Sequence, residues 1–168
     1  MTTADIRQII ATAVAHEHET GELRARLTAA LPELSERLDI PGPEPVDALL
    51  DFIESYIASV PGCLNLVTAV SRRLGFYDYA APFLHIAEDF FLAPPEDLPD
   101  TGGLGLLLDE AFLAHRLLEE INDHHLRHLG RPLLPLDMTE ANTVVHHLLG
   151  DTLATRLERL VQFTAERL

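Results

Sequence analysis

The chain has 168 residues and a formal net charge of −15, because it holds 27 acidic residues and only 12 basic ones, all of them arginine. A protein that binds the phosphate backbone of nucleic acid needs clustered lysine and arginine, so this balance excludes nucleic acid as an expected partner. Hydrophobic residues make up 47% of the chain, which is enough to bury one core, and we expect a single helical domain over residues 1–168.

Two further features of the composition concern the cellular compartment. No run approaches the roughly 20 consecutive apolar residues of a membrane-spanning helix, and the N-terminal residues lack the basic-then-apolar order of a signal peptide. We therefore expect a soluble, cytoplasmic protein with no membrane partner. Cys63 is the only cysteine, so no intrachain disulfide can form, a multi-cysteine zinc site is excluded, and a packed core thiol is expected.

Apolar residues recur at helical spacing through the first half of the chain, and no stretch shows the two-residue period of a strand. Gly21 is a possible break in the first helix, and Pro61 with Gly62 is expected to break or kink a later one. Residues 39–45 are rich in proline and glycine and are expected to form a linker. The predicted helical segments are residues 4–30, a short helix that follows Pro32, and residues 46–60, 64–74 and 79–92.

The second half of the chain is predicted to hold two long helices. A loop over residues 93–103 is followed by a helix over residues 104–129, and a final helix is expected from Met138 to about Arg167. The short connection between these helices implies an antiparallel hairpin, so the predicted fold is an all-α bundle of five to six helices whose last two form the hairpin. A simple two-layer packing would expose four apolar residues on the flank of helix 104–129: Leu108, Phe112, Leu113 and Leu126.

The loop and the start of this long helix carry a recognisable pattern. An Asp-Leu-Pro-Asp turn at residues 97–100 is followed by Gly105 and then by the acidic pair Asp109 and Glu110. This stretch, residues 95–110, resembles the YkvA-like family, a bacterial domain of unknown function with an Asp-Leu-Ile-Pro-Asp turn, a glycine and an Asp-Asp pair that opens a helix. Here the isoleucine is missing and Glu110 replaces the second aspartate. The resemblance implies a small helical bacterial domain and supplies no established reaction.

The four acids of this pattern also have ordinary structural explanations. Asp97 and Asp100 are typical turn and cap residues. Asp109 and Glu110 are expected near the start of the helix, where acids interact favourably with the helix dipole. Glu110 also falls along the flank of the apolar face, so we expect it to be partly buried.

Histidines on the last two predicted helices indicate a possible metal site. His125 and His146 fall on facing stripes of the hairpin, offset along its axis by roughly 6 Å if the turn is tight. His124 and His128 are four residues apart on one helix, a spacing that can hold zinc if a third group comes near. Zinc, iron and manganese are the candidate ions. The Glu-x-x-His string of di-iron bundles is absent, and a satisfied core or surface histidine is the alternative explanation for each position.

The sequence favours an interaction module over an enzyme. It contains no serine or cysteine elbow and no Gly-rich phosphate loop between a strand and a helix, so no catalytic residue is assigned. The predicted function is protein interaction or self-association through an acidic or apolar face, with a protein or a second copy of the chain as partner. The alternative is a metal-binding bundle with a His/carboxylate site, hydrolytic or redox, which convergence of His125 and His146 with a carboxylate would favour. A pocket that gathers polar groups of shifted pKa would favour an enzyme.

Overall fold

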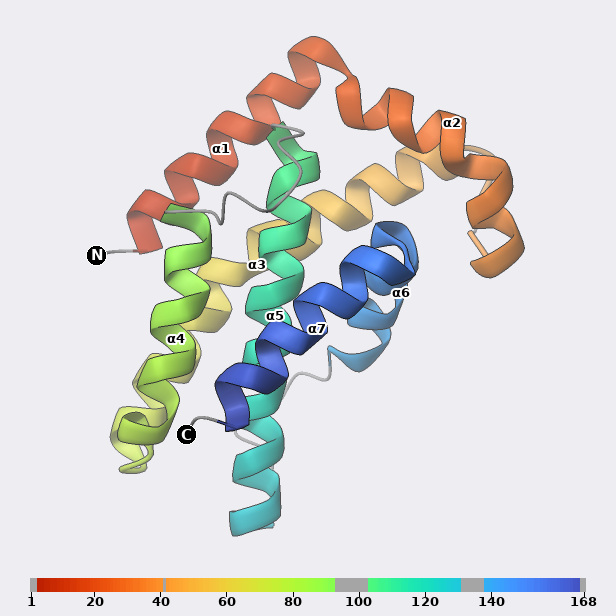
Figure 1. The fold of residues 1–168 in the computed structure, drawn as a ribbon. Coiled ribbons are helices and arrows are strands. Elements are labelled where there is room, and N and C mark those ends of the chain that lie inside the picture. The colour runs from red at the N-terminus through yellow and green to blue at the C-terminus, as the bar shows by residue number, and fades with distance from the viewer. Residues whose placement is uncertain (1–2, 41, 93–102, 131–137, 167–168) are drawn as a thin grey trace.

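The computed structural model describes residues 3–40, 42–92, 103–130 and 138–166, and for residues 3, 90, 106, 124–129, 164 and 165 it describes the backbone alone. This part of the chain holds seven helices and no strand, which confirms the predicted all-α class (Figure 1). The helices are α1 (Thr3–Thr20), α2 (Glu22–Arg37), α3 (Pro45–Arg73), α4 (Tyr77–Leu92), α5 (Gly103–Leu129), α6 (Thr139–Leu149) and α7 (Asp151–Glu166).

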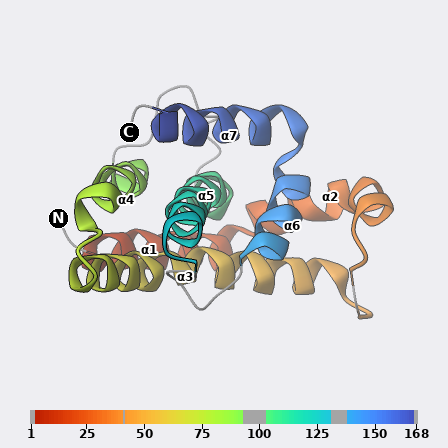
Figure 2. The ribbon, with the colours of Figure 1, turned by 90° about the horizontal axis from the view of Figure 1, so that it is seen from below.

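Helix α5 lies at the centre of the molecule. Figure 2 shows it nearly end-on, with α1 and α3 on one side, α7 on the opposite side, and α4 and α6 flanking it. Helix α5 contacts all five of these helices. Side chains on every face of its first half are therefore buried, among them Leu107, Leu108, Phe112 and Ala114.

This central position overturns one expectation about α5. Leu108, Phe112 and Leu113 were predicted to be exposed, but their exposed fractions are 5%, 1% and 1%. The expectation is wrong because it assumed two layers, whereas α5 is enclosed by neighbouring helices on several sides. The side chain of Leu126 lies outside the described residues.

Two glycines set the number of helices. Gly21 has φ +66° and separates α1 from α2, and Gly150 has φ +88° and separates α6 from α7. Residues with a Cβ rarely adopt such positive φ values, so the helix ends at each glycine. The prediction of five to six helices is thereby corrected to seven in the described residues, and the second helix of the predicted antiparallel hairpin is two helices instead of one.

Helix α3 runs without interruption through Pro61 and Gly62, where a break or kink was expected. Val60, Leu64 and Val67 are buried on either side of the proline, so packing outweighs the missing backbone hydrogen bond. Cys63, predicted to be a packed thiol, is also buried in this helix. Among the described helices α3 alone is long and apolar enough to cross a membrane, although the core helix of a soluble protein meets the same test.

Candidate functional site

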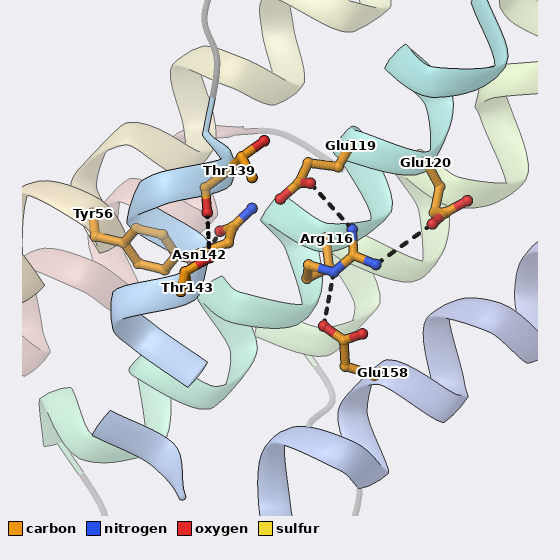
Figure 3. A network of polar contacts seen from close by, with 8 residues as sticks. All are labelled: Tyr56, Arg116, Glu119, Glu120, Thr139, Asn142, Thr143 and Glu158. Carbon is orange, nitrogen blue, oxygen red and sulfur yellow. Dashed lines mark hydrogen bonds and ion pairs between the residues drawn. The ribbon is translucent and has the colours of Figure 1, made fainter. Parts of the chain in front are cut away.

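A layer of buried polar side chains joins α5 to α3 and α6. The Tyr56 hydroxyl of α3 donates a hydrogen bond to Oδ1 of Asn142 on α6, two residues whose side chains meet in Figure 3. Nε2 of His115 on α5 lies 3.0 Å from the backbone oxygen of Tyr56 and 3.0 Å from the Ser59 hydroxyl. Because a carbonyl oxygen can only accept, Nε2 carries a proton and donates it. These bonds tie three helices together.

The protonation state of this layer follows from its burial. His115 is 1% exposed, and burial lowers its pKa to about 4, so the ring is neutral near pH 7. Burial also raises the pKa of the Tyr56 hydroxyl, which keeps its proton. The sequence analysis missed His115 as a buried residue. The signal was present, because His115 follows Ala111 by four residues and precedes Leu118 by three, on the edge of the predicted apolar face.

Arg116, the next residue of α5, faces α7 and is held by three carboxylates (Figure 3). Its Nε lies 2.9 Å from Glu158 of α7, and its two terminal nitrogens lie 3.3 Å from Glu119 and 3.5 Å from Glu120. The side chain of Arg116 is 14% exposed. The ion pair with Glu158 joins α5 to α7, and each of the three guanidinium nitrogens lies close to a carboxylate of the protein itself.

The acidic pair Asp109 and Glu110 is buried, with exposed fractions of 5% and 0%. Both carboxyl oxygens of Glu110 are buried without a hydrogen-bond partner among the described residues. Burial raises the pKa of Asp109 to about 7, and burial with the charge of Asp109 raises the pKa of Glu110 to about 8. Helix α5 begins at Gly103 and has no acid in its first turn, so the explanation by the helix dipole is wrong for this pair. The expected burial of Glu110 is confirmed.

Asp109 and Glu110 are adjacent in α5, so their side chains point about 100° apart around the helix axis. Asp109 lies on a different face and lines a cavity with residues of α2, α6 and α7. The two acids are thus neighbours in sequence but occupy separate environments.

A second polar region, which we call the acidic cleft, lies between the α1–α2 junction and the start of α3 and has a volume of about 750 Å³. Six carboxylates line it, together with His18 and Arg24: Glu17, Glu19, Glu44, Asp47, Asp51 and Glu54. His18 lies 3.3 Å from Glu54, and Arg24 forms an ion pair with Asp47. The hydrogen bond with Asp47 and its charge raise the pKa of Glu44, which shows how closely the carboxylates crowd.

The acids of this cleft have different roles in the fold. The carboxylate of Glu17 accepts hydrogen bonds from the backbone N–H groups of Leu23 and Arg24, at 2.7 and 3.1 Å, and so caps the start of α2. This cap stabilises the conformation of the α1–α2 junction. Glu19 and Asp51 form no hydrogen bond or ion pair with a described residue, so their carboxylates are open to a partner.

Among the four histidines of the predicted metal site, His146 alone has a described side chain. Nε2 of His146 lies 3.4 Å from the exposed carboxylate of Asp151, and its ring packs near those of Phe112 and His147. The side chains of His124, His125 and His128 lie outside the described residues, as do Asp97 and Asp100. Within the described part of the chain no group of three or more metal-ligating side chains comes together. The metal site stays a prediction.

Comparisons with known proteins found no relative. No protein-family model matches the chain, no curated protein matches its sequence, and no solved structure matches its fold. The resemblance of residues 95–110 to the YkvA-like family therefore stays a prediction that rests on the motif, and any function has to be argued from the geometry of the residues themselves.

Proposed function

We propose that this protein is an interaction module that binds a basic segment of a partner protein in the acidic cleft. The observation that carries the proposal is the concentration of six carboxylates around a cleft of about 750 Å³, against one arginine. A low-charge groove would bind by apolar contact, whereas this one presents a negative potential that attracts lysine and arginine side chains and steers their approach.

The arrangement of the lining supports a protein partner. Glu17 and the Arg24–Asp47 ion pair fix the walls, while Glu19, Glu44 and Asp51 supply acceptors along the opening. Arginine side chains on a flexible segment form paired hydrogen bonds with carboxylates at such spacing. A second copy of the chain is a poorer partner for this cleft, since it carries the same charge of −15. A cytoplasmic location belongs to the same proposal.

The direct test is a binding titration of the full chain with a short synthetic arginine-rich peptide, followed by calorimetry at low and high salt. We expect saturable binding that weakens as salt is added, because the cleft is open to solvent. The double variant Glu44→Gln/Asp51→Asn removes two charges from the cleft and should weaken binding by about tenfold.

The matched control removes two exposed acids on other helices, Asp89 of α4 and Glu166 of α7, as Asp89→Asn/Glu166→Gln. Both double variants change the net charge equally, so a loss confined to the cleft variant supports the proposal. Equal losses in the two variants would show attraction by net charge alone and overturn it. A glutamate-rich peptide of the same length should not bind.

A further inference from the structure

A second cavity, separate from the acidic cleft, lies between α2, α5, α6 and α7 and has a volume of about 230 Å³. Seven leucines from these four helices line it, and its only charged lining residues are Asp109 of α5 and Arg26 of α2. An apolar cavity with very few polar groups is the usual form of a small-molecule site, although this one is smaller than the roughly 300–1,000 Å³ of drug-sized pockets.

Asp109 is the feature of this cavity that the fold leaves unexplained. Its side chain is 5% exposed and lines the cavity, yet it forms no hydrogen bond or ion pair with any described residue. A buried carboxyl group is normally paired, because it loses its hydration on burial. Asp109 therefore has a bonding capacity that a molecule inside the cavity can use.

We propose that the cavity binds a small amine with a compact apolar body, whose ammonium group pairs with the Asp109 carboxylate and whose hydrocarbon part packs among the leucines. The charge of the surroundings selects an amine over an acid. Asp109 is the acid that lines the cavity, and the whole chain carries a charge of −15, so a carboxylate ligand would meet like charges.

The charged groups around Asp109 fix how this binding responds to pH. Burial opposes the ionisation of Asp109, and the positive charge of the exposed Arg26 favours it; the neighbouring Glu110 is itself mostly protonated near pH 7, and α6 and α7 contribute only leucines to the lining. With a pKa of about 7, Asp109 is mostly protonated at pH 6 and mostly ionised at pH 8. An alkylammonium group stays charged over this range, as the lysine side chain does. Amine affinity should therefore rise with pH.

The experiment is a calorimetric titration of the full chain with cyclohexylamine, cyclohexanol and cyclohexanecarboxylate at pH 6 and pH 8. We expect cyclohexylamine to bind at one site, about tenfold more tightly at pH 8, and the other two to bind far more weakly. Equal binding of cyclohexanol would show an apolar cavity without an ion pair, and preferred binding of the carboxylate would reverse the assigned chemistry. Either outcome, or no saturable amine binding, overturns the proposal.

Two variants locate the site. Asp109→Asn keeps the shape of the side chain and removes its charge, so it should lower cyclohexylamine affinity at pH 8 by about tenfold or more and abolish the pH dependence. Ala30→Leu fills the cavity from α2 while leaving Asp109 in place and should also prevent binding. Asp89→Asn, at an exposed position of α4 outside both sites, changes the net charge as Asp109→Asn does and should leave amine binding unchanged. Unchanged affinity in Asp109→Asn would contradict the assignment.

Discussion

Two sets of buried polar side chains differ in their hydrogen bonding. The first consists of His115 of α5 with Tyr56 and Asn142, and the second is Glu110, five residues earlier on α5. His115 has a hydrogen-bonding partner in α3, and Tyr56 and Asn142 pair across α3 and α6. Glu110, buried to the same degree, has no partner for either carboxyl oxygen among the described residues. In the first set each side chain forms a hydrogen bond inside the protein, although Nδ2 of Asn142 has no partner among the described residues, whereas Glu110 has lost its hydration without any replacement.

The difference shows that burial alone does not decide whether a polar residue stabilises the fold. Burial shifts both pKa values towards the neutral form, downwards to about 4 for His115 and upwards to about 8 for Glu110. Around pH 7 both groups are therefore neutral, but their contributions to stability change with pH in opposite directions.

The largest effect is expected at His115. His115→Ala removes a buried ring and leaves a cavity beside the Tyr56 backbone oxygen, so the free energy of unfolding should fall by about 2–4 kcal/mol. Because the folded pKa of His115 is about 4 and its unfolded value is 6.5, the unfolded state binds more protons between these limits. The His115 site thus favours folding fully above about pH 6.5, and the loss measured by urea denaturation should shrink as the pH falls towards 4.

The exposed His85 of α4 supplies the control for this substitution. His85→Ala should change the free energy of unfolding by less than about 0.5 kcal/mol. If His115→Ala lowered the free energy of unfolding as little as His85→Ala, the polar layer would not hold α3 and α5 together. His115 and Glu110 would then not differ in their effect on stability.

The next effect is a gain in stability at Glu110. In the folded protein its pKa of about 8 lies above the ordinary value of 4.5, so between these limits the folded state holds a proton that the unfolded state has released. Stability from this site is therefore complete below about pH 4.5 and is lost as the pH rises to 8. Glu110→Gln removes that loss and should raise the free energy of unfolding by about 1–3 kcal/mol at pH 8.5, with little change at pH 4.5.

Urea denaturation at both pH values measures this gain, with the exposed Glu166→Gln on α7 as the control. The control variant should match the unmodified protein at each pH. A destabilising effect of Glu110→Gln at pH 8.5 would show that the Glu110 carboxylate has a favourable partner and that the two sets of polar residues do not differ.

Helical periodicity made the fold class predictable, because apolar spacing is a property of each segment taken alone. The number of helices was not predictable, because residues that usually interrupt a helix do so at one position and not at another. Pro61 lies within a continuous helix because buried residues on both sides hold it, while Gly150 ends a helix with a positive φ that nothing in its neighbourhood of the sequence required. These outcomes depend on tertiary packing.

The candidate sites were predictable to a similarly limited degree. The place of Glu110 on the flank of an apolar face correctly indicated burial, but its neighbour Asp109 became notable only when α2, α6 and α7 enclosed a cavity around it. The acidic cleft joins Glu17 and Glu19 of α1 to four acids that lie just before α3 or in its first turns, a segment that begins more than twenty residues further along the chain. Only the assembled helices bring such groups together.

The smallest effect is expected at Arg116, whose partners are charged but partly open to water. Glu158→Gln weakens the 2.9 Å contact between α5 and α7, yet Arg116 keeps Glu119 and Glu120, and the Glu158 side chain is 34% exposed. Solvent screening then limits the loss in the free energy of unfolding to about 0.5 kcal/mol, and added salt should reduce it further. Urea denaturation of Glu158→Gln at low and high salt checks this, with the exposed Glu166→Gln on the same helix as the control. A salt-independent loss in the free energy of unfolding as large as that of His115→Ala would show that this ion pair is not screened by solvent and stabilises the fold as strongly as the buried His115 does.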